Sequence, residues 1–335
     1  INNNNTPVGM ISGQAALFNI QDPNNNIILD PNGVGMSMAM SINDNSQIVG
    51  IISVFDSQSY TFYDDATLFD LTGSAENIYL GALPGYANSC ASANNNNNLI
   101  VGSVYNDPTL NQSRPVLFDP TANANNIDLG TTGGQYASAV AINDLDQPVG
   151  WSQNTQGQYH AALFNINDPS KNIDLGSLPG CSESGAGDIN NKGQIIGWAK
   201  PDDNSLDFIP VLFDSTGNKN NKNLNDLIDP NSGWLLKEAY SINDHGWIVG
   251  QAIDPHGNPR AYLLKPIETI NCKHFAAMAQ YYKQNINPND PQFIASSADL
   301  NSDGLVDMSD IKILADYWLS EISLHQIQNQ HKQLP

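Results

Sequence analysis

The residues best suited to chemistry lie near the C-terminus, in the acidic segment 299–310, DLNSDGLVDMSD. Oxygen-bearing side chains stand at positions 1, 3, 5, 9 and 12 of this segment, and a glycine stands at position 6. Calcium takes roughly six to eight oxygen ligands, and this spacing can wrap them around one ion while position 7 offers its backbone carbonyl. The sequence therefore predicts a Ca²⁺ site formed by Asp299, Asn301, Asp303, Leu305, Asp307 and Asp310.

Helices are expected on either side of this loop. Apolar residues at helical spacing occur in two segments that align 36 residues apart, His274–Tyr282 and Asp310–Trp318. Each segment has the pattern of an amphipathic helix with one buried stripe. We expect a small helical module over 267–320 and a polar tail over 321–335. A plain acidic surface loop is the alternative interpretation of the segment 299–310.

The loop and helices together resemble the type I dockerin, a calcium-binding module with two loop–helix halves. Asp310 at position 12, where the general calcium loop has Glu, is typical of the dockerin version. The matching first segment, Leu263–His274, has no oxygen ligand at positions 1, 5 or 12, so we expect one working site. The resemblance implies docking to a cohesin-like or cell-surface protein. Met308 and Ser309, at positions 10 and 11, depart from the pair of hydroxyl residues common in cohesin-binding dockerins.

A repeated ten-residue segment organises the rest of the chain. SINDNSQIVG at Ser41–Gly50 recurs with changes, and the other copies end at Gly9, Gly102, Gly150, Gly197 and Gly250. The spacing of roughly 41 to 53 residues is typical of a propeller or solenoid. Within each copy, Asn-Asp or a related pair lies between two apolar runs, which is typical of a hairpin turn.

The recurrent carboxylates Asp44, Asp144 and Asp244 invite a catalytic or metal-binding interpretation. Asn and Asp side chains commonly bond the backbone of their own turn, and recurrence argues against a unique site. We therefore interpret the three residues as parts of turns. The glycine that ends each copy lies within a predicted strand, where glycine usually marks a bend or a close backbone approach.

Each repeat carries four short apolar segments bounded by Gly, Pro, Asn and Asp, which is the pattern of β-strands. Four strands per repeat of about 48 residues is typical of a propeller blade. The predicted fold class is mainly β: a six-bladed, or alternatively seven-bladed, β-propeller over 1–266, followed by the small α-helical module. The first copy lacks most of its opening strand and the last lacks its closing strand. A shared blade explains this with six blades, whereas missing upstream sequence would allow seven.

The third strand of each repeat resembles the HAF family of extracellular repeats. His160-Ala161-Ala162-Leu163-Phe164 carries the resemblance, and the other repeats have a segment ending in Leu-Phe or Leu-Leu at the same place. The resemblance covers about residues 1–265. It implies export and a repeat architecture, without an established reaction. We interpret His160 as a structural residue at a strand edge rather than as a ligand.

The chain is acidic, with 13 Lys+Arg against 34 Asp+Glu and a net charge of −21. This argues against nucleic acid and anionic membrane surfaces as partners, because both need clustered positive charge. No apolar run approaches the ~18 residues of a membrane span. The cysteines Cys90, Cys181 and Cys272 have no metal spacing, and we interpret them as small buried thiols. We expect a secreted bacterial protein, extracellular or attached to the cell surface, whose start at Ile1 indicates a mature or truncated product.

Two functions compete. In the favoured one, the protein is a secreted, non-enzymatic, polysaccharide-associated scaffold whose propeller binds a glycan or protein and whose calcium module mediates docking or attachment. The alternative is a secreted carbohydrate-active propeller hydrolase or lyase with a dockerin-like appendage. An enzyme needs a cluster of carboxylates, or of carboxylate with His or Tyr, at one end of the ring.

Several polar residues break the repeat and are candidates for such a cluster, although they form no recognisable motif in the sequence. They are Asp64, Asp65, Glu183, Asp202, Asp203, Glu238 and His245. Loop aromatic residues could stack on sugars or fill gaps between blades. These are Tyr60, Tyr63, Tyr86, Trp198, Trp234 and Trp247.

Overall fold

The structure is a computed structural model that describes residues 1–31, 33, 35–56, 61–74, 76–106, 112–123, 125–202, 208–266, 305 and 307–310. The chain divides into two compact units, Ile1–Lys265 and Pro266–Pro335. The expected helix at 274–282, and all of the second helix beyond residue 310, lie outside the described residues. In the second unit the described residues are Pro266, Leu305 and a short stretch that ends in the helical turn 308–310.

The first unit is mainly β, as predicted, and its described strands form six antiparallel groups, called sheets 1 to 6 here in chain order. A parallel pairing of Ser113 with Tyr136 joins sheets 3 and 4 into one eight-stranded sheet. Sheets 1 and 2 contain β1 (Val8–Ile11), β2 (Gln14–Leu17) and β3 (Ile27–Ile28), then β4 (Ser37–Ile42), β5 (Ile48–Asp56), β6 (Thr61–Phe69) and β7 (Ile78–Tyr79). Sheets 3 and 4 contain β8 (Asn88–Asn94), β9 (Ile100–Tyr105), β10 (Ser113–Phe118) and β11 (Ile127–Asp128), then β12 (Gly133–Ile142), β13 (Pro148–Asn154), β14 (Tyr159–Leu163) and β15 (Ile173–Gly176). Sheets 5 and 6 contain β16 (Cys181–Ile189), β17 (Ile195–Pro201), β18 (Ile209–Phe213) and β19 (Lys222–Asn223), then β20 (Leu235–Ile242), β21 (Ile248–Ile253) and β22 (Pro259–Leu264). Three short 3-10 helices lie in connections, η1 (Pro23–Asn25), η2 (Pro169–Lys171) and η3 (Leu224–Leu227).

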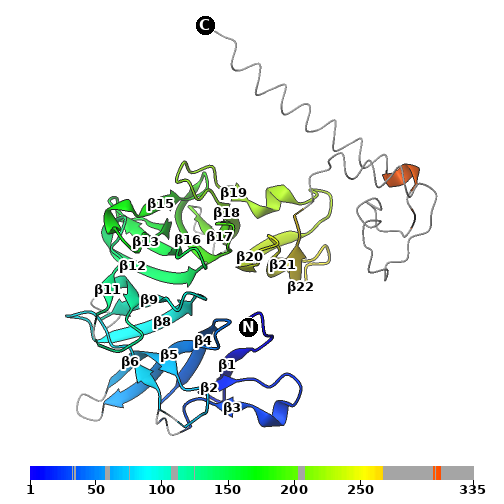
Figure 1. Cartoon of the computed structure of the whole chain (residues 1–335). Helices are drawn as coiled ribbons and strands as arrows, with labels where there is room; N and C mark the ends of the chain where they lie inside the picture. The colour runs from blue at the N-terminus through cyan, green and yellow to red at the C-terminus, as the bar shows by residue number, and fades with distance from the viewer. Residues whose placement is uncertain are drawn as a thin grey trace. The chain divides into compact units, whose positions relative to one another are not determined.

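The sheets follow one another around a common centre, a propeller-like arrangement that Figure 1 shows for the first unit. Sheets 2 to 5 each have four strands in chain order, and β4, β8, β12, β16 and β20 are the first strands of sheets 2 to 6. These five strands lie nearest the centre. Among the described strands, sheet 1 lacks this inner strand and sheet 6 lacks the outer one.

Steric crowding explains why a glycine recurs at the end of the repeated segment. A Cβ on Gly150 would stand 2.0 Å from the carbonyl oxygen of Ser138 on the inner strand, and Gly50, Gly102, Gly197 and Gly250 meet the equivalent oxygen at 1.9–2.0 Å. Each inner strand has a register shift at this point, as between Ala139 and Ala141. The predicted close backbone approach is thus confirmed, and it accompanies a β-bulge.

The turn before each glycine run needs one residue with positive φ. Gly193 and Gly246 supply it without strain, and Asn98 and Asp146 adopt it at φ 63° and 59°. Ser46, which fits this conformation less well, adopts it too, at φ 64°. The turn geometry is therefore set by the repeat rather than by each residue's own preference.

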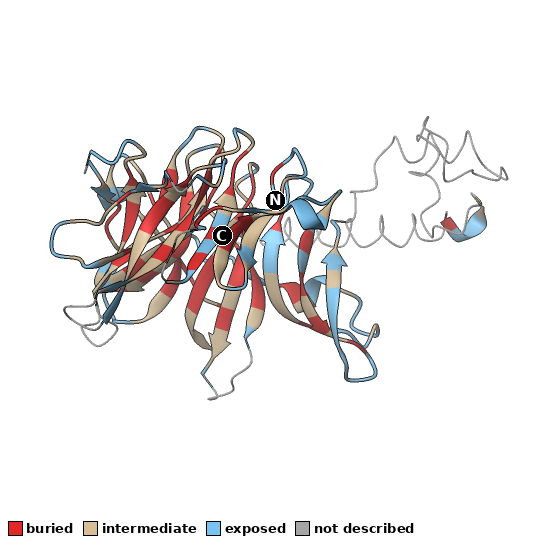
Figure 2. Cartoon of the chain, turned by 90° about the horizontal axis from the view of Figure 1, so that it is seen from below, coloured by how far each residue is buried: buried red, intermediate tan, exposed pale blue. Residues whose placement is uncertain are grey.

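Apolar side chains fill the spaces between neighbouring sheets. Val149, Ala161 and Leu175 of sheet 4 pack against Ala186 and Ile195 of sheet 5, and similar clusters join the other neighbours. Figure 2 shows the buried residues gathered on these strands. No single sheet can bury both of its faces alone, so the core exists only because the sheets stack.

Polar bonds reinforce this stacking away from the centre. The Asn before each outer strand donates from its side-chain amide to a backbone carbonyl of the preceding sheet over 2.7–3.1 Å. The same residue accepts a backbone N–H from seven residues earlier in its own sheet. The four residues are Asn77, Asn126, Asn172 and Asn221.

Sheet 6 has an uncovered face. Val149, which faces sheet 5, is fully buried, whereas Val249 at the equivalent place in sheet 6 is 42% exposed. Leu263 on the same sheet is 50% exposed. The difference follows from position, because no following sheet packs against this face of sheet 6 in the part of the chain that the structure describes.

Candidate functional site

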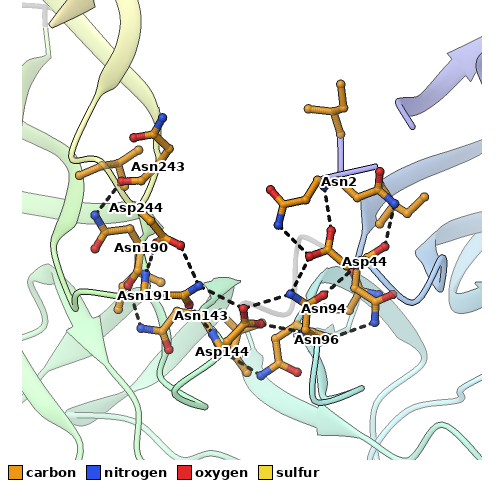
Figure 3. Close-up of a pocket in the computed structure, with 18 of the residues that line it drawn as sticks. Asn2, Asp44, Asn94, Asn96, Asn143, Asp144, Asn190, Asn191, Asn243 and Asp244 are labelled. Carbon is orange, nitrogen blue, oxygen red and sulfur yellow. Dashed lines mark hydrogen bonds between the residues drawn. The ribbon is translucent and has the colours of Figure 1, made fainter. Parts of the chain in front are cut away.

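The turns of the six repeats meet in a polar pocket of about 470 Å³, drawn in Figure 3. In sheets 1 to 5 the first Asn of the turn donates from its side-chain amide to the backbone oxygen of the matching Asn in the next sheet, over 2.8–3.0 Å. The side-chain oxygen of each Asn accepts backbone N–H groups of its own turn. These residues are Asn2, Asn43, Asn95, Asn143, Asn190 and Asn243.

The second residue of the turn alternates between amide and carboxylate from sheet to sheet. Its order is Asn3, Asp44, Asn96, Asp144, Asn191 and Asp244. The Asn96 amide donates to both flanking carboxylates, Asp44 and Asp144, over 3.1 Å each. Asn191 does the same for Asp144 and Asp244 at 3.1 and 3.0 Å. Each donor therefore lies between two acceptors.

Contrary to what the sequence led us to expect, the described hydrogen bonds of the three repeated carboxylates do not run to their own turns. Asp44, Asp144 and Asp244 are turn residues, but the Asn before each of them bonds its own turn, and the Asp bonds the turn of the preceding sheet. The reason is position, since the second turn residue projects toward the neighbouring turn. The backbone N–H and side chain of Asn3 hold the pKa of Asp44 below its usual range. Both oxygens of each carboxylate accept hydrogen bonds, so the ring serves structure.

A different carboxylate collects hydrogen bonds between sheets 2 and 3. Asp64, on β6, accepts from the Ser53 hydroxyl on β5 and from the Tyr105 hydroxyl at the end of β9. Its backbone N–H donates to Asn88 over 2.9 Å, and the Asn88 amide donates to the Tyr105 backbone oxygen over 3.3 Å. Asp64, Ser53 and Tyr105 are all partly exposed. The four residues form one connected network that reaches solvent.

The environment of this network fixes the protonation state of the phenol. Burial, together with the hydrogen bond and the charge of Asp64, raises the pKa of Tyr105 above its usual range. Tyr105 is therefore a neutral proton donor at physiological pH. The pKa of Asp65 is also raised, mainly because the side chain is buried. Repulsion from the negative charge of Asp64 adds to this effect. Asp64 was among the candidates from the sequence, whereas Tyr105 ends an ordinary strand and carried no signal there.

The other polar candidates from the sequence do not form a cluster in the structure. Glu183 pairs with Lys200 at 3.2 Å, and Asp202 accepts the Ser182 backbone N–H at 2.7 Å. The Glu238 carboxylate raises the pKa of the Tyr240 hydroxyl through a hydrogen bond. His245 lies at the rim of the turn pocket against Trp247. Asp203 lies outside the described residues. Among the described residues, no group of three or more His, Cys, Asp or Glu is placed to hold a metal ion.

The aromatic candidates also separate. Trp198 contacts Phe208, with ring centroids 5.0 Å apart, and Trp247 lies under the Lys265 ammonium at 4.3 Å. Tyr86 packs against the cluster between sheets 2 and 3. Trp234 borders a small apolar pocket of sheet 6. Tyr63 lies one residue before Asp64 on β6, and Tyr60 falls outside the described residues.

His160 has a structural partner. Its Nδ1 lies 2.8 Å from the Asp174 carboxylate on the neighbouring strand of sheet 4. Arg114 and Asp128 form the equivalent pair in sheet 3, at 2.9 Å. The interpretation of His160 as a strand residue rather than a ligand agrees with this pairing, which recurs between the same two strands.

The calcium loop is described only in part, since Asp299, Asn301 and Asp303 lie outside the described residues. Asp307 accepts the Ser309 backbone N–H at 2.7 Å, and Asp310 accepts the Asp307 N–H at 2.8 Å. Asp307 thus acts as the N-cap of a helix start, and Asp310 binds back to the Asp307 backbone. Leu305 is partly buried and Asp310 is fully buried. The calcium site, the dockerin and HAF resemblances and the cohesin-like partner stay predictions.

Comparisons with solved structures give distant likenesses. No family model and no curated protein matches the chain. A solved structure of a gluconolactonase from Xanthomonas campestris is similar with a TM-score of 0.41 and 13% identity, over 78% of this chain and 82% of that chain. This corrects the expected non-enzymatic scaffold, since the similar structure is that of an enzyme, although the likeness itself is one of fold alone. Within the described part of the chain, no helix is long and apolar enough to span a membrane.

Proposed function

We propose that the chain is an exported acid–base enzyme, a hydrolase or lyase of carbohydrate-derived substrates, built on a six-bladed β-propeller. The observation that carries the proposal is the convergence of two hydroxyl groups, from Ser53 and Tyr105, on the Asp64 carboxylate. A carboxylate beside a neutral phenol provides a proton acceptor and a proton donor within one hydrogen bond, which is the minimum that general acid–base catalysis needs.

The roles follow from the hydrogen bond between the two groups and from the neutral phenol of Tyr105. In hydrolysis, Asp64 takes a proton from the attacking water, whose oxygen bonds to the substrate carbon. Tyr105 gives its proton to the oxygen that leaves. The proton on Asp64 then passes along the existing hydrogen bond to the Tyr105 oxygen, which restores both groups. Asn88 holds the two strands in register through its bonds to both residues.

The test is a turnover screen of the full chain on sugar lactones, glycans and uronate polymers. Gluconolactone is included because the similar structure is named for it. Asp64→Asn and Tyr105→Phe should each reduce kcat by roughly 10²–10⁴, the usual contribution of one acid–base group. Tyr159→Phe is the matched control, since Tyr159 is another partly buried tyrosine, on sheet 4. Turnover that survives both Asp64→Asn and Tyr105→Phe would refute the assignment, and so would the absence of turnover on every substrate.

A second proposal concerns calcium. The contacts of Asp307 and Asp310 support it, because the carboxylates at positions 9 and 12 of the predicted loop lie together at the start of one helix. Asp303→Ala in the full chain should abolish calcium binding in a calorimetric titration. Glu76→Gln, which removes one exposed carboxylate from the first unit, should leave it unchanged. Equal binding by both variants would contradict the site.

A further inference from the structure

Three of the six methionines of the chain lie within five residues, Met36, Met38 and Met40. Successive side chains of a strand point to opposite faces, so residues two apart share a face. Along β4, exposed Met38 and Met40 alternate with buried Ser37 and Ala39. The methionines are 59%, 36% and 42% exposed in chain order. They therefore form a row of thioethers on the open face of the strand rather than in the core.

A fourth sulfur atom joins this row from the next sheet. Cys90, on β8, lies with its Sγ 3.5 Å from the Met40 Sδ. β4 and β8 are the innermost strands of sheets 2 and 3. Cys90 is a free thiol. Burial raises its pKa to about 11, so the sulfur is protonated at neutral pH when nothing is bound.

The repeat does not demand sulfur at these places. The residues that pair with the repeat glycines align the inner strands, so Met38 corresponds to Cys90, Ser138, Gly185 and Glu238. The equivalent position is occupied by a polar residue, a charged residue or glycine in sheets 4 to 6. The sulfur atoms are therefore a local departure from the repeat, concentrated where sheets 2 and 3 meet.

The sulfur–sulfur distance fits shared coordination. With metal–sulfur bonds of about 2.3 Å, two ligands of one tetrahedral ion lie about 3.8 Å apart. Met38 and Met40 start about 7 Å apart along one face of the strand, and the flexible thioether chain can close that distance. Thioether and thiol ligands select soft monovalent copper over harder cations such as calcium or magnesium.

We propose that Met38, Met40 and Cys90 form a binding site for a soft monovalent cation of the Cu(I) class, with Met36 extending the row toward solvent. Cys90 binds as a thiolate and releases its proton to solvent, since a coordinating thiol is deprotonated. No electron is transferred. The site neighbours the Asp64 and Tyr105 pair of the proposed enzyme, because the Asp64 charge contributes to the raised pKa of Cys90 and Cys90 contributes to that of Tyr105.

The test titrates the full chain anaerobically with Cu(I) in competition with a chromophoric chelator, and with Ag(I) as a redox-inert probe. Binding should produce sulfur-to-copper absorption in the near ultraviolet. Met40→Leu and Cys90→Ser should each weaken Cu(I) binding by more than roughly tenfold, because changing residues that merely support metal ligands already weakens binding by roughly tenfold or more. Leu replaces Met with little change in volume, so the fold should persist. Met10→Leu is the matched control, because Met10 is also an exposed methionine, at 43%, on β1 of sheet 1.

The outcomes separate a site from a simple contact. If Cys90 only donates a hydrogen bond to Met40, the parent will not hold Cu(I) against the chelator, and the proposal fails. Binding that is equal in the parent, Met40→Leu and Cys90→Ser would also overturn it. If a variant does not fold, X-ray absorption of the Ag(I)-loaded parent decides the matter. Sulfur neighbours support the site, and a shell of oxygen and nitrogen refutes it.

Discussion

The alternation of Asn and Asp around the turn pocket leads to a sharp prediction for Asn96→Asp. This change keeps the shape of the side chain and the oxygen that accepts the Asp44 backbone N–H at 2.8 Å. It replaces only the amide nitrogen that now donates to Asp44 and Asp144. The variant would place three carboxylates side by side where the repeat places a donor between two acceptors.

The expected cost can be worked from the contacts. Two hydrogen bonds to charged groups are lost, and such bonds contribute about 1.5 kcal/mol each at the lower end of their range. Two new like-charge contacts add about 1 kcal/mol each at a separation of ~4 Å in water. Solvent screening and side-chain movement reduce the sum, because these carboxylates are near the surface. We therefore expect a loss of about 3–5 kcal/mol in the free energy of unfolding.

The sign of the pH dependence offers a second readout. The new carboxyl group would have a folded-state pKa above its unfolded value, because two negative neighbours favour its neutral form. Its stability contribution is present below the unfolded pKa and is lost as the pH rises through the folded pKa. Urea denaturation at several pH values should show the variant approaching the parent as the pH falls.

The matched control is Asn167→Asp, which adds the same charge at an exposed position of sheet 4. The Asn167 side chain makes no hydrogen bond among the described residues, so this change should shift the urea midpoint little. Equal destabilisation by both variants would attribute the effect to net charge. A stable Asn96→Asp variant with no pH dependence would refute the role of the alternation.

Three further predictions test other parts of the fold. Gly150→Ala should lower the free energy of unfolding by about 3 kcal/mol or more, because its Cβ would stand 2.0 Å from the Ser138 oxygen. Gly187→Ala should change little in the same urea titration, since its Cβ would meet nothing closer than 3.8 Å. Burial raises the pKa of Asp188 in spite of the hydrogen bonds that it accepts from Ser241 and Ile242. The contribution of Asp188 to the free energy of unfolding is therefore present below its unfolded pKa and is lost as the pH rises through its folded pKa. Asp188→Asn should therefore flatten the decline of urea midpoints with rising pH. Val149→Ala should cost roughly 1.6 kcal/mol, at about 0.8 kcal/mol for each buried carbon removed, and Val249→Ala should cost less because Val249 is 42% exposed. Equal costs would mean that the uncovered face of sheet 6 is covered in solution.

The local features of the repeat were predictable because they depend on residues close in sequence. The glycine at the end of each copy indicated a close backbone approach, and Gly150 has it. The turn indicated a residue with positive φ, and Asp146 and Ser46 adopt this conformation. The strands of each sheet were predictable from short apolar segments that recur in the same order in each repeat. In each case a steric rule acts within a few residues, and the period repeats its signature.

The candidate site was not predictable in the same way. Tyr105 meets Asp64 from 41 residues away, and the contact depends on how sheet 3 stacks on sheet 2. Neither residue belongs to the repeat pattern, and no local spacing relates them. The partners of Asp44 were missed for the same reason, since its bonds run to Asn3 and Asn96 in neighbouring sheets rather than within its turn. The calcium loop is the opposite case, because its pattern is entirely local.

The alternation of Asn and Asp at the second turn position also limits how repeats can be added to or removed from the chain. Asn3, Asn96 and Asn191 match one another, as do Asp44, Asp144 and Asp244, so each repeat matches the repeat two places away at this position. Duplicating or deleting one repeat would bring two carboxylates or two amides together, whereas duplicating two repeats preserves every donor and acceptor. At this position the pattern repeats over pairs of repeats, so designed rings of other sizes should be assembled in twos.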